Sequence, residues 1–149
     1  MARTRGGPEK LRRWLKHQTR VNLPAWSGGV HREVHFQLVD GLVSDTPVGN
    51  PTLWKHPPPK GYSGGRAKGN WQSSIHRALP GETGRIDPSG RATKAANAAA
   101  IAKIQVPVAS YISNNVPYIV RLNQAPQWSK QQTPHWFERN LQRVRAQFE

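Results

Sequence analysis

Two histidines one helical turn apart are the residues of this chain best spaced for metal chemistry. His31 and His35 stand at i and i+4, so on a helix both imidazoles can share one face and one metal ion. The local order HREVH places Glu33 at the third position, whereas the HExxH zinc-protease pattern requires glutamate at the second. The sequence shows no third ligand and contains no cysteine to supply a thiolate. We therefore expect neither a metal site nor a cofactor.

A glycine-rich run has the composition of a phosphate-binding loop. It reads GGRAKG at residues 64–69, but no GK[ST] follows it, and we expect a strand rather than a helix next. Serine, histidine and carboxylate side chains do not occur at a recognisable catalytic spacing, and only 8 Asp and Glu residues are available for acid–base work. The sequence therefore favours a protein without catalytic residues, which is not an enzyme.

Positive charge is concentrated near the N-terminus. The chain has 22 Lys and Arg against 8 Asp and Glu, a net charge of +14. Residues 1–20 contain seven basic residues and one acidic residue, Glu9. The seven are candidates for contact with DNA or with a protein partner: Arg3, Arg5, Lys10, Arg12, Arg13, Lys16 and Arg20. Such an excess of charge indicates a negatively charged partner.

The same segment predicts a basic amphipathic helix. Pro8 suits the first helical position, and Pro24 should end the segment. One face of the helix carries Leu11, Trp14, Leu15 and Gln18. Such a helix suits nucleic acid or a membrane surface, and the alternative is a solvated helix that lies on its own domain through Trp14. We expect a basic arm over residues 1–25 and a single α+β domain over residues 26–149.

The rest of the chain predicts helices packed on a small antiparallel sheet. Helices are expected over residues 30–43, 92–104 and 134–148, and strands over residues 70–79 and 109–114. Thr46-Pro47 should stop the first helix, and Thr133 should cap the last one at Pro134. One face of the last helix carries Phe137, Leu141, Val144 and Phe148, and we expect the first three to face the core. Asn114-Asn115 should turn the chain after the second strand, with left-handed backbone angles available to both residues.

A long loop rich in Pro and Gly occupies residues 45–69. Loops of this length within a compact domain are usually functional or disordered, and aromatic residues argue against disorder. Trp54 and Tyr62 should be buried, either on their own domain or under a neighbouring subunit. We take four residues as interface candidates: Trp54, Tyr62, Arg66 and Trp128.

No apolar run approaches the length of a membrane span, and the N-terminus lacks the hydrophobic segment of a signal peptide. We therefore expect a soluble protein that works where it is made, with no membrane partner.

Three sequence blocks occur in an order that resembles the tail-completion, or head–tail joining, neck proteins of tailed bacteriophages. The first contains Thr46-Pro47-Val48, Gly49-Asn50-Pro51, Trp54, Gly61-Tyr62, Gly64-Gly65-Arg66 and Asn70-Trp71, similar to that family's TPV…G…R…NW. The second, ISNNVPY at residues 112–118, resembles its N-N-x-P-Y turn. The third contains Leu122-Asn123, residues 128–131 and Pro134, and resembles L-[EN]-x-G…S-x-Q-A-P. Ala125-Pro126 replaces the usual Gly, and Gln132-Thr133 replaces the Ala before Pro134.

The resemblance implies an α+β domain that assembles as a ring of six or twelve copies, with six favoured. It implies a virion location at the head–tail junction, after synthesis in the host bacterial cytoplasm. The partners would be the head connector or stopper and the tail tube or tail terminator, with non-specific contact to genomic DNA. The competing interpretation is a small basic nucleic-acid-binding protein that acts on its own, which the charge supports. Six Trp residues and the absence of a helix-turn-helix, RNP or zinc signature argue against it.

Overall fold

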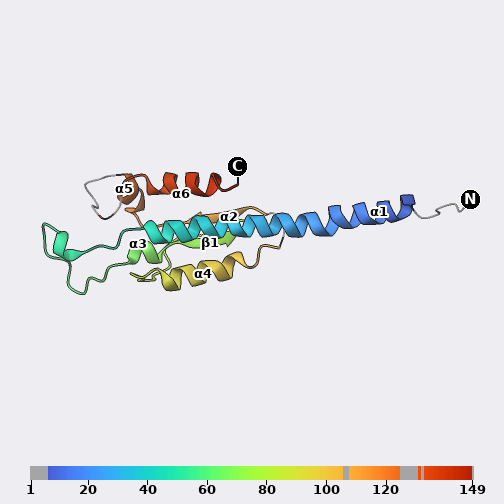
Figure 1. Cartoon of the computed structure of the whole chain (residues 1–149). Helices are drawn as coiled ribbons and strands as arrows, with labels where there is room; N and C mark the ends of the chain where they lie inside the picture. The colour runs from blue at the N-terminus through green and yellow to red at the C-terminus, as the bar shows by residue number, and fades with distance from the viewer. Residues whose placement is uncertain (1–6, 106–107, 125–130, 132, 149) are drawn as a thin grey trace, which may run out of the picture.

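The computed structural model describes residues 7–105, 108–124, 131 and 133–148, and it shows an α+β fold (Figure 1). The elements in chain order are α1 (Gly7–His17), the π-helical turn η1 (Gln18–Asn22), α2 (Leu23–Asp45), the 3-10 turn η2 (Pro51–Leu53), α3 (Arg66–Gly69), β1 (Gln72–Ile75), α4 (Arg91–Ile101), β2 (Ser110–Ser113), α5 (Ile119–Gln124) and α6 (Trp136–Arg145). The predicted class, helices packed on a small antiparallel sheet, is confirmed.

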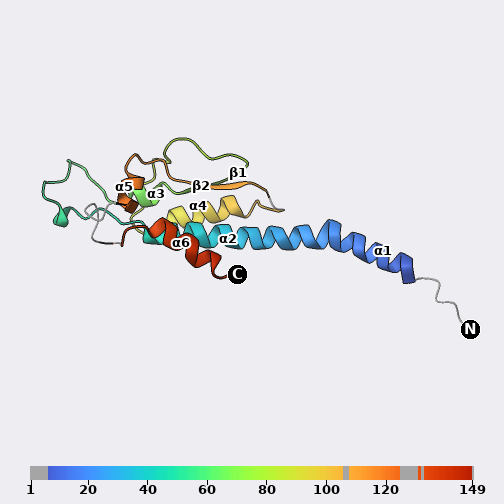
Figure 2. The same ribbon diagram turned by 90° about the horizontal axis from the view of Figure 1, so that it is seen from above.

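One long helix runs from α1 through η1 and α2 and forms the axis of the molecule (Figures 1 and 2). The prediction that Pro24 ends the first helix is wrong, because Pro24 lies in the first turn of α2. Proline has no N–H to donate, and the turn before it is a π turn in which Leu23 donates to the carbonyl of Gln18. The helix ends after Asp45, since Thr46 has extended backbone angles, and the predicted stop at Thr46-Pro47 is confirmed.

The sheet consists of β1 and β2, which pair antiparallel with Gln72 opposite Ser113 and Ile75 opposite Ser110. Both predicted strands exist but are shorter than expected. The first ends at Ile75 because His76 takes a positive φ of 73° and Ser74 donates a hydrogen bond to the carbonyl of Arg77. Asn114 follows β2 without a positive φ, which among the described non-glycine residues occurs at His76 and His135. Its side chain instead accepts from the N–H of Val116, which redirects the chain toward α5.

The core lies where α2, the sheet, α4 and the C-terminal helices meet. Its buried apolar residues are Val39, Leu42, Val43, Ala67, Trp71, Ile101, Ile104, Val116, Ile119 and Trp136. Trp71 is central: its indole N–H donates to the hydroxyl of Thr46 at 2.7 Å, and its ring meets Trp136 and Phe137 edge to face. Trp71 and Trp136 are buried and Phe137 is half-buried, so this aromatic cluster adds a large apolar area to the core of a small domain.

The terminal helix packs on α2 through a face different from the predicted one. Trp136, Asn140 and Val144 are buried, so the prediction that Val144 faces the core is confirmed. Leu141 is 59% exposed, so the same prediction for Leu141 is wrong, and Phe148 is exposed as well. Asn140 takes the buried position because its amide donates to Asp45 and to the carbonyl of Trp136. Buried amides are tolerated when they are bonded in this way.

The start of α6 also differs from the sequence prediction. The helix begins at Trp136, not Pro134, because the N–H of Phe137 donates to the side-chain oxygen of Asn123 at 2.9 Å. His135 precedes the helix with a φ of 62° and donates its N–H to the carbonyl of Asn123. Asn123, at the end of α5, therefore supplies the cap that we assigned to Thr133.

The helix predicted over residues 92–104 is α4, which forms within a few residues of that range. A carboxylate, that of Asp87, stabilises its first turn. Asp87 accepts hydrogen bonds from the N–H and the hydroxyl of Thr93, both at 2.8 Å, and from the N–H of Gly90 at 2.9 Å. Burial raises the pKa of Asp87, but the hydrogen bonds from Thr93, Ser89 and Gly90 outweigh it and hold that pKa below its usual value. An ionised Asp87 thus fixes the first turn of α4.

Candidate interaction surfaces

The first part of the long helix projects from the rest of the molecule as an arm. We define the helical arm as residues 7–26, since burial against other elements begins at Ser27 and Gly28. Both ribbon views show it extending beyond the sheet and α4, with the long loop at the opposite end of the molecule (Figures 1 and 2). Twenty helical residues span about 30 Å. The predicted alternative in which Trp14 packs on its own domain is not observed, because Trp14 is exposed.

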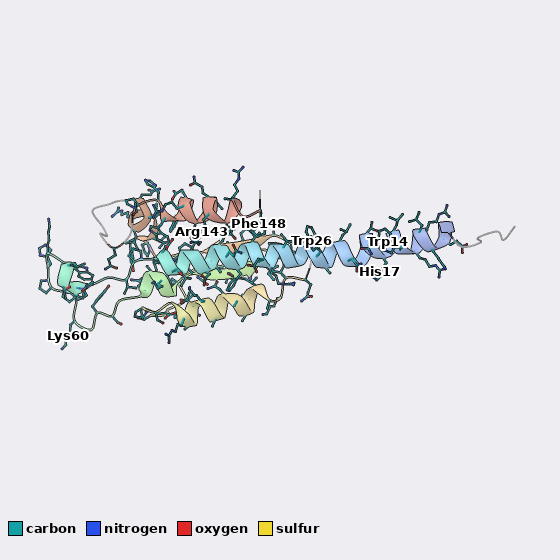
Figure 3. All side chains as sticks on the ribbon, in the orientation of Figure 1. Trp14, His17, Trp26, Lys60, Arg143 and Phe148 are labelled. Atoms are coloured by element: carbon teal, nitrogen blue, oxygen red, sulfur yellow. The ribbon has the colours of Figure 1, made fainter. Side chains whose placement is uncertain are left out.

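An apolar stripe runs the length of the helical arm. Its exposed members are Leu11, Trp14, Leu15, Leu23 and Trp26. A π turn holds one residue more than an α turn, so after η1 Leu23 and Trp26 take the positions of i+11 and i+14 relative to Leu11. Three helical turns contain about 10.8 residues, so these positions continue the same face. Trp14 and Trp26 are labelled on this part of the helix in Figure 3.

The basic candidates of the arm lie beside this stripe or opposite to it. Lys10, Arg12, Arg13, Lys16 and Arg20 are exposed along α1 and η1. At about 100° per residue, Arg13 points roughly opposite to Leu11. Arg3 and Arg5 lie outside the described residues. The structure therefore places five of the seven predicted basic residues on one helix, with an apolar and a basic side.

The two histidines connect α2 to both strands. Nε2 of His31 and Nδ1 of His35 each lie 2.8 Å from the hydroxyl of Ser110, and Nε2 of His35 lies 2.9 Å from the hydroxyl of Ser73. Burial, and to a smaller extent the neighbouring His31, together lower the pKa of His35 to about 4. Among the residues that the structure describes, no group of three or more His, Asp or Glu is placed to hold a metal ion. The ring nitrogens thus serve the packing of helix on sheet.

The aromatic residues of the long loop contact each other. The rings of Trp54 and Tyr62 meet edge to face at 4.7 Å, and the Tyr62 ring lies against Gly49, where a Cβ would be 2.0 Å from the phenol oxygen. Trp54 is 41% and Tyr62 38% exposed, so their predicted burial on their own domain is wrong, and burial under a neighbour stays a prediction. Trp128 lies outside the described residues.

Arg66 and the adjacent glycines have structural roles. Arg66 donates to both carboxylate oxygens of Glu82, at 2.8 and 2.6 Å, a bond that raises the pKa of Arg66 and lowers that of Glu82. Gly65 has a φ of 103°, and a Cβ there would lie 2.4 Å from the backbone nitrogen of Pro88. Contrary to expectation, a helix follows directly, but α3 has only four residues before β1 begins. The glycines therefore allow close backbone packing.

An open apolar groove lies between α2, β2, α5 and α6, and sequence reasoning missed it. Its volume is about 460 Å³, and its lining residues are Leu38, Leu42, Trp71, Ile112, Asn114, Ile119, Val120, Phe137, Glu138 and Leu141. Val120 and Leu141 are more than half exposed. Glu138 is the charged side chain among the described lining residues, and a hydrogen bond from Asn123 holds its pKa below the usual value. The sequence of α6 could have indicated this groove, because the helix carries apolar residues on two faces and only one of them can pack in the core.

Buried and half-buried polar residues of the sequence blocks join the elements that surround these surfaces. Thr46 bonds Trp71, Asn70 accepts from the N–H of Thr83 at 2.7 Å, and Asn123 caps α6. Asn114 donates to the carbonyl of Ala67 at 2.8 Å. Each of these residues belongs to one of the three blocks identified in the sequence.

Comparisons of this chain with protein-family models, with curated proteins and with solved structures found no match. Within the described residues, no helix combines the length and the apolar character needed to cross a membrane.

Proposed function

We propose that the chain is a structural virion protein of a tailed bacteriophage. In this proposal it assembles as a ring at the head–tail junction, completes the tail and joins it to the head connector. The observation that carries the proposal is a pair of apolar surfaces that no described residue covers, the stripe of the helical arm and the groove beside α6 of this small basic chain. Ring subunits keep such surfaces for their neighbours, because a monomer would leave them in water.

The roles of the block residues support the same assignment. Thr46, Asn70, Asn114 and Asn123 are among the residues that carry the resemblance to neck proteins, and each joins two parts of the chain through a hydrogen bond. Residues that define a fold are the ones a family of like-folded proteins must share. The resemblance therefore concerns the framework of the domain as well as its surface.

The helical arm supplies the contact with charged partners in this proposal. Its basic side faces away from the apolar stripe, so one side can bind protein while the other meets phosphates or acidic protein surfaces. Repeated around a ring, five basic residues per copy create a strong field that holds DNA without reading its bases. The role needs no enzymatic activity, and the proposed partners are the head connector or stopper and the tail tube or terminator.

A nucleic-acid-binding protein that acts alone is the second candidate, favoured by the charge of the arm. A duplex bound to the basic side would leave Leu11, Trp14 and Leu15 uncovered. The apolar stripe therefore favours the ring over the isolated binding protein.

Mass measurement in solution separates the two functions. We expect the purified chain to form closed rings of one defined copy number, six rather than twelve, by light scattering and native mass spectrometry. Binding of a fluorescent random-sequence duplex at physiological salt should be weak and without sequence preference. A monomer that binds one duplex sequence tightly and selectively would refute the neck-protein function in favour of its rival.

A further inference from the structure

We propose that the helical arm of one copy lies in the apolar groove of a neighbouring copy. This inference rests on the proposed ring and specifies the contact that would hold it together. It concerns two surfaces of the described chain that nothing in the described chain covers: the arm stripe and the groove beside α6.

The helical arm cannot reach the groove of its own chain. The groove is lined by Leu38 and Leu42, which lie on the same continuous helix as the arm. Trp14 and Leu38 are 24 positions apart, which is about 36 Å along a helix. Figures 1 and 2 show the arm directed away from α5 and α6. A groove filled by an arm must therefore receive it from another copy.

The two surfaces match in chemistry. Leu11, Trp14 and Leu15 are spaced i, i+3 and i+4, the pattern with which an amphipathic helix anchors in a hydrophobic groove. The groove offers exposed aliphatic side chains, Val120 on α5 and Leu141 on α6, as the complementary surface. Docking would remove both sets of apolar side chains from water at once.

Charge at the edges agrees with this placement. Glu138 lines the groove and is held ionised by its hydrogen bond from Asn123, whereas the helical arm is basic. Lys10 lies one turn before Trp14, at the edge of the stripe, where its ammonium can approach a carboxylate on the rim. The remaining basic side of the arm stays in solvent.

A second copy of this chain can supply the helix that occupies the groove. Every chain carries one arm and one groove, so each copy can give and receive once without another component. Such a head-to-tail contact between unlike surfaces generates a closed ring when the rotation between copies closes. An arm-to-arm pair would instead join like surfaces, stop at two copies and leave the groove empty.

Single-cysteine variants test this contact, because the chain has no cysteine of its own. One variant, Leu11→Cys, places a thiol on the stripe, and its matched control, Arg13→Cys, places one on the opposite side two residues away. Each would be mixed with a groove variant, Val120→Cys or Leu141→Cys, and treated with a short bis-maleimide. We expect Leu11→Cys to form the mixed dimer with at least one groove variant, with a yield at least tenfold above that of Arg13→Cys. Denaturing gels and peptide mass spectrometry would identify the linked residues.

Other outcomes overturn the inference and are distinct from failure of the proposed function. Equal yields from Leu11→Cys and Arg13→Cys, or linkage of Leu11→Cys only to itself, would show that the arm does not dock in the groove. If wild-type rings were still seen by mass, the ring function would stand and the docking would be wrong. A wild-type chain that stayed monomeric would overturn both. Protection of the arm thiols by added random-sequence duplex, with no linkage to groove variants, would assign the arm to nucleic acid instead.

A second measurement does not depend on cross-linking. Trp14→Ala should shift the ring to smaller species and raise the concentration needed for assembly at least tenfold, while the exposed position keeps the body folded. Circular dichroism and thermal unfolding would verify the fold. Rings of unchanged mass and concentration dependence in this variant would refute the docking of the arm.

Discussion

Acidification should weaken the contact between α2 and the sheet through one buried side chain, His35. Both of its ring nitrogens lie within hydrogen-bond distance of hydroxyl groups on the two strands, and only 4% of the residue is exposed. Its pKa is lowered from 6.5 to about 4 in the folded chain, so the unfolded chain binds the proton more readily. The contribution of neutral His35 to the free energy of unfolding is therefore fully present above pH 6.5, and it is lost as the pH falls from 6.5 toward 4.

The size of the effect follows from the shift. At about 1.4 kcal/mol per pKa unit, a shift from 6.5 to about 4 corresponds to about 3 kcal/mol in full. Between pH 7 and pH 4.5 the linkage relation gives a loss of about 2 kcal/mol in the free energy of unfolding. Asp87 and Glu138 have pKa values lowered from 3.8 and 4.5, so the stability they add is lost mainly below this range.

Urea unfolding between pH 7 and pH 4.5, followed by tryptophan fluorescence, measures this loss. The variant His35→Gln keeps a donor and an acceptor but cannot titrate. We expect it to be less stable than wild type at pH 7 and to lose about 2 kcal/mol less on acidification. If wild type and His35→Gln showed the same dependence on pH over this range, the assignment of the effect to His35 would be wrong.

Three further substitutions test the packing, each by thermal or urea unfolding. Gly41→Ala should destabilise the chain by about 1–3 kcal/mol, since its Cβ would lie 2.0 Å from the side-chain oxygen of Asn140. Gly29, in the same helix, is the matched control, because a Cβ there would lie 3.8 Å from a guanidinium nitrogen of Arg32. Gly29→Ala should stabilise the chain by up to about 1 kcal/mol, and equal effects of the two substitutions would contradict the close approach of α6 to α2. Trp136→Ala should cost about 3–5 kcal/mol because the side chain is fully buried, and a cost under about 1 kcal/mol would place it outside the core. Asp87→Asn should cost about 1–3 kcal/mol by weakening the bonds that start α4, and an unchanged midpoint would refute that role.

Local sequence rules correctly predicted those helices and strands whose positions depend on residues nearby in the sequence. The stop of α2 at Thr46-Pro47 follows from the extended conformation that proline imposes on the residue before it. The alternation of Trp71, Ser73 and Ile75 placed β1 because one face of that strand is buried. These features depend on few residues, and tertiary contacts agree with them.

The errors arose where a distant residue decides the outcome. Pro24 is accommodated by a π turn, so the arm and α2 form one helix instead of two. No residue type in the sequence predicts such a turn. In α6, periodicity favours Leu141 for the core as strongly as Val144, and contacts from other elements, the bond between Asn140 and Asp45 on α2 among them, select the other face. The cap from Asn123 is equally invisible, since it reaches α6 from a different helix.

The two candidate surfaces differ in the same respect: one depends on residues close together in the sequence and the other on distant ones. The basic and amphipathic character of the arm is local, and it was predicted from the residues themselves. The groove was not, because its lining comes from α2, β2, α5 and α6, and its existence depends on how these elements meet. Exposure of Leu141 turned a predicted core residue into part of a surface.

The walls of the groove have a consequence for the order of events during synthesis. Leu42 and Leu141 both line it, yet they are separated by 99 positions in the sequence. A ribosome adding about 5–20 residues per second completes the arm and α2 roughly 5–20 s before it finishes α6. A nascent chain therefore displays its arm while it still lacks a groove of its own. In the proposed ring, an arm emerging from a ribosome could be received only by a finished chain, so the proposed contact predicts that rings close after the translation of their subunits.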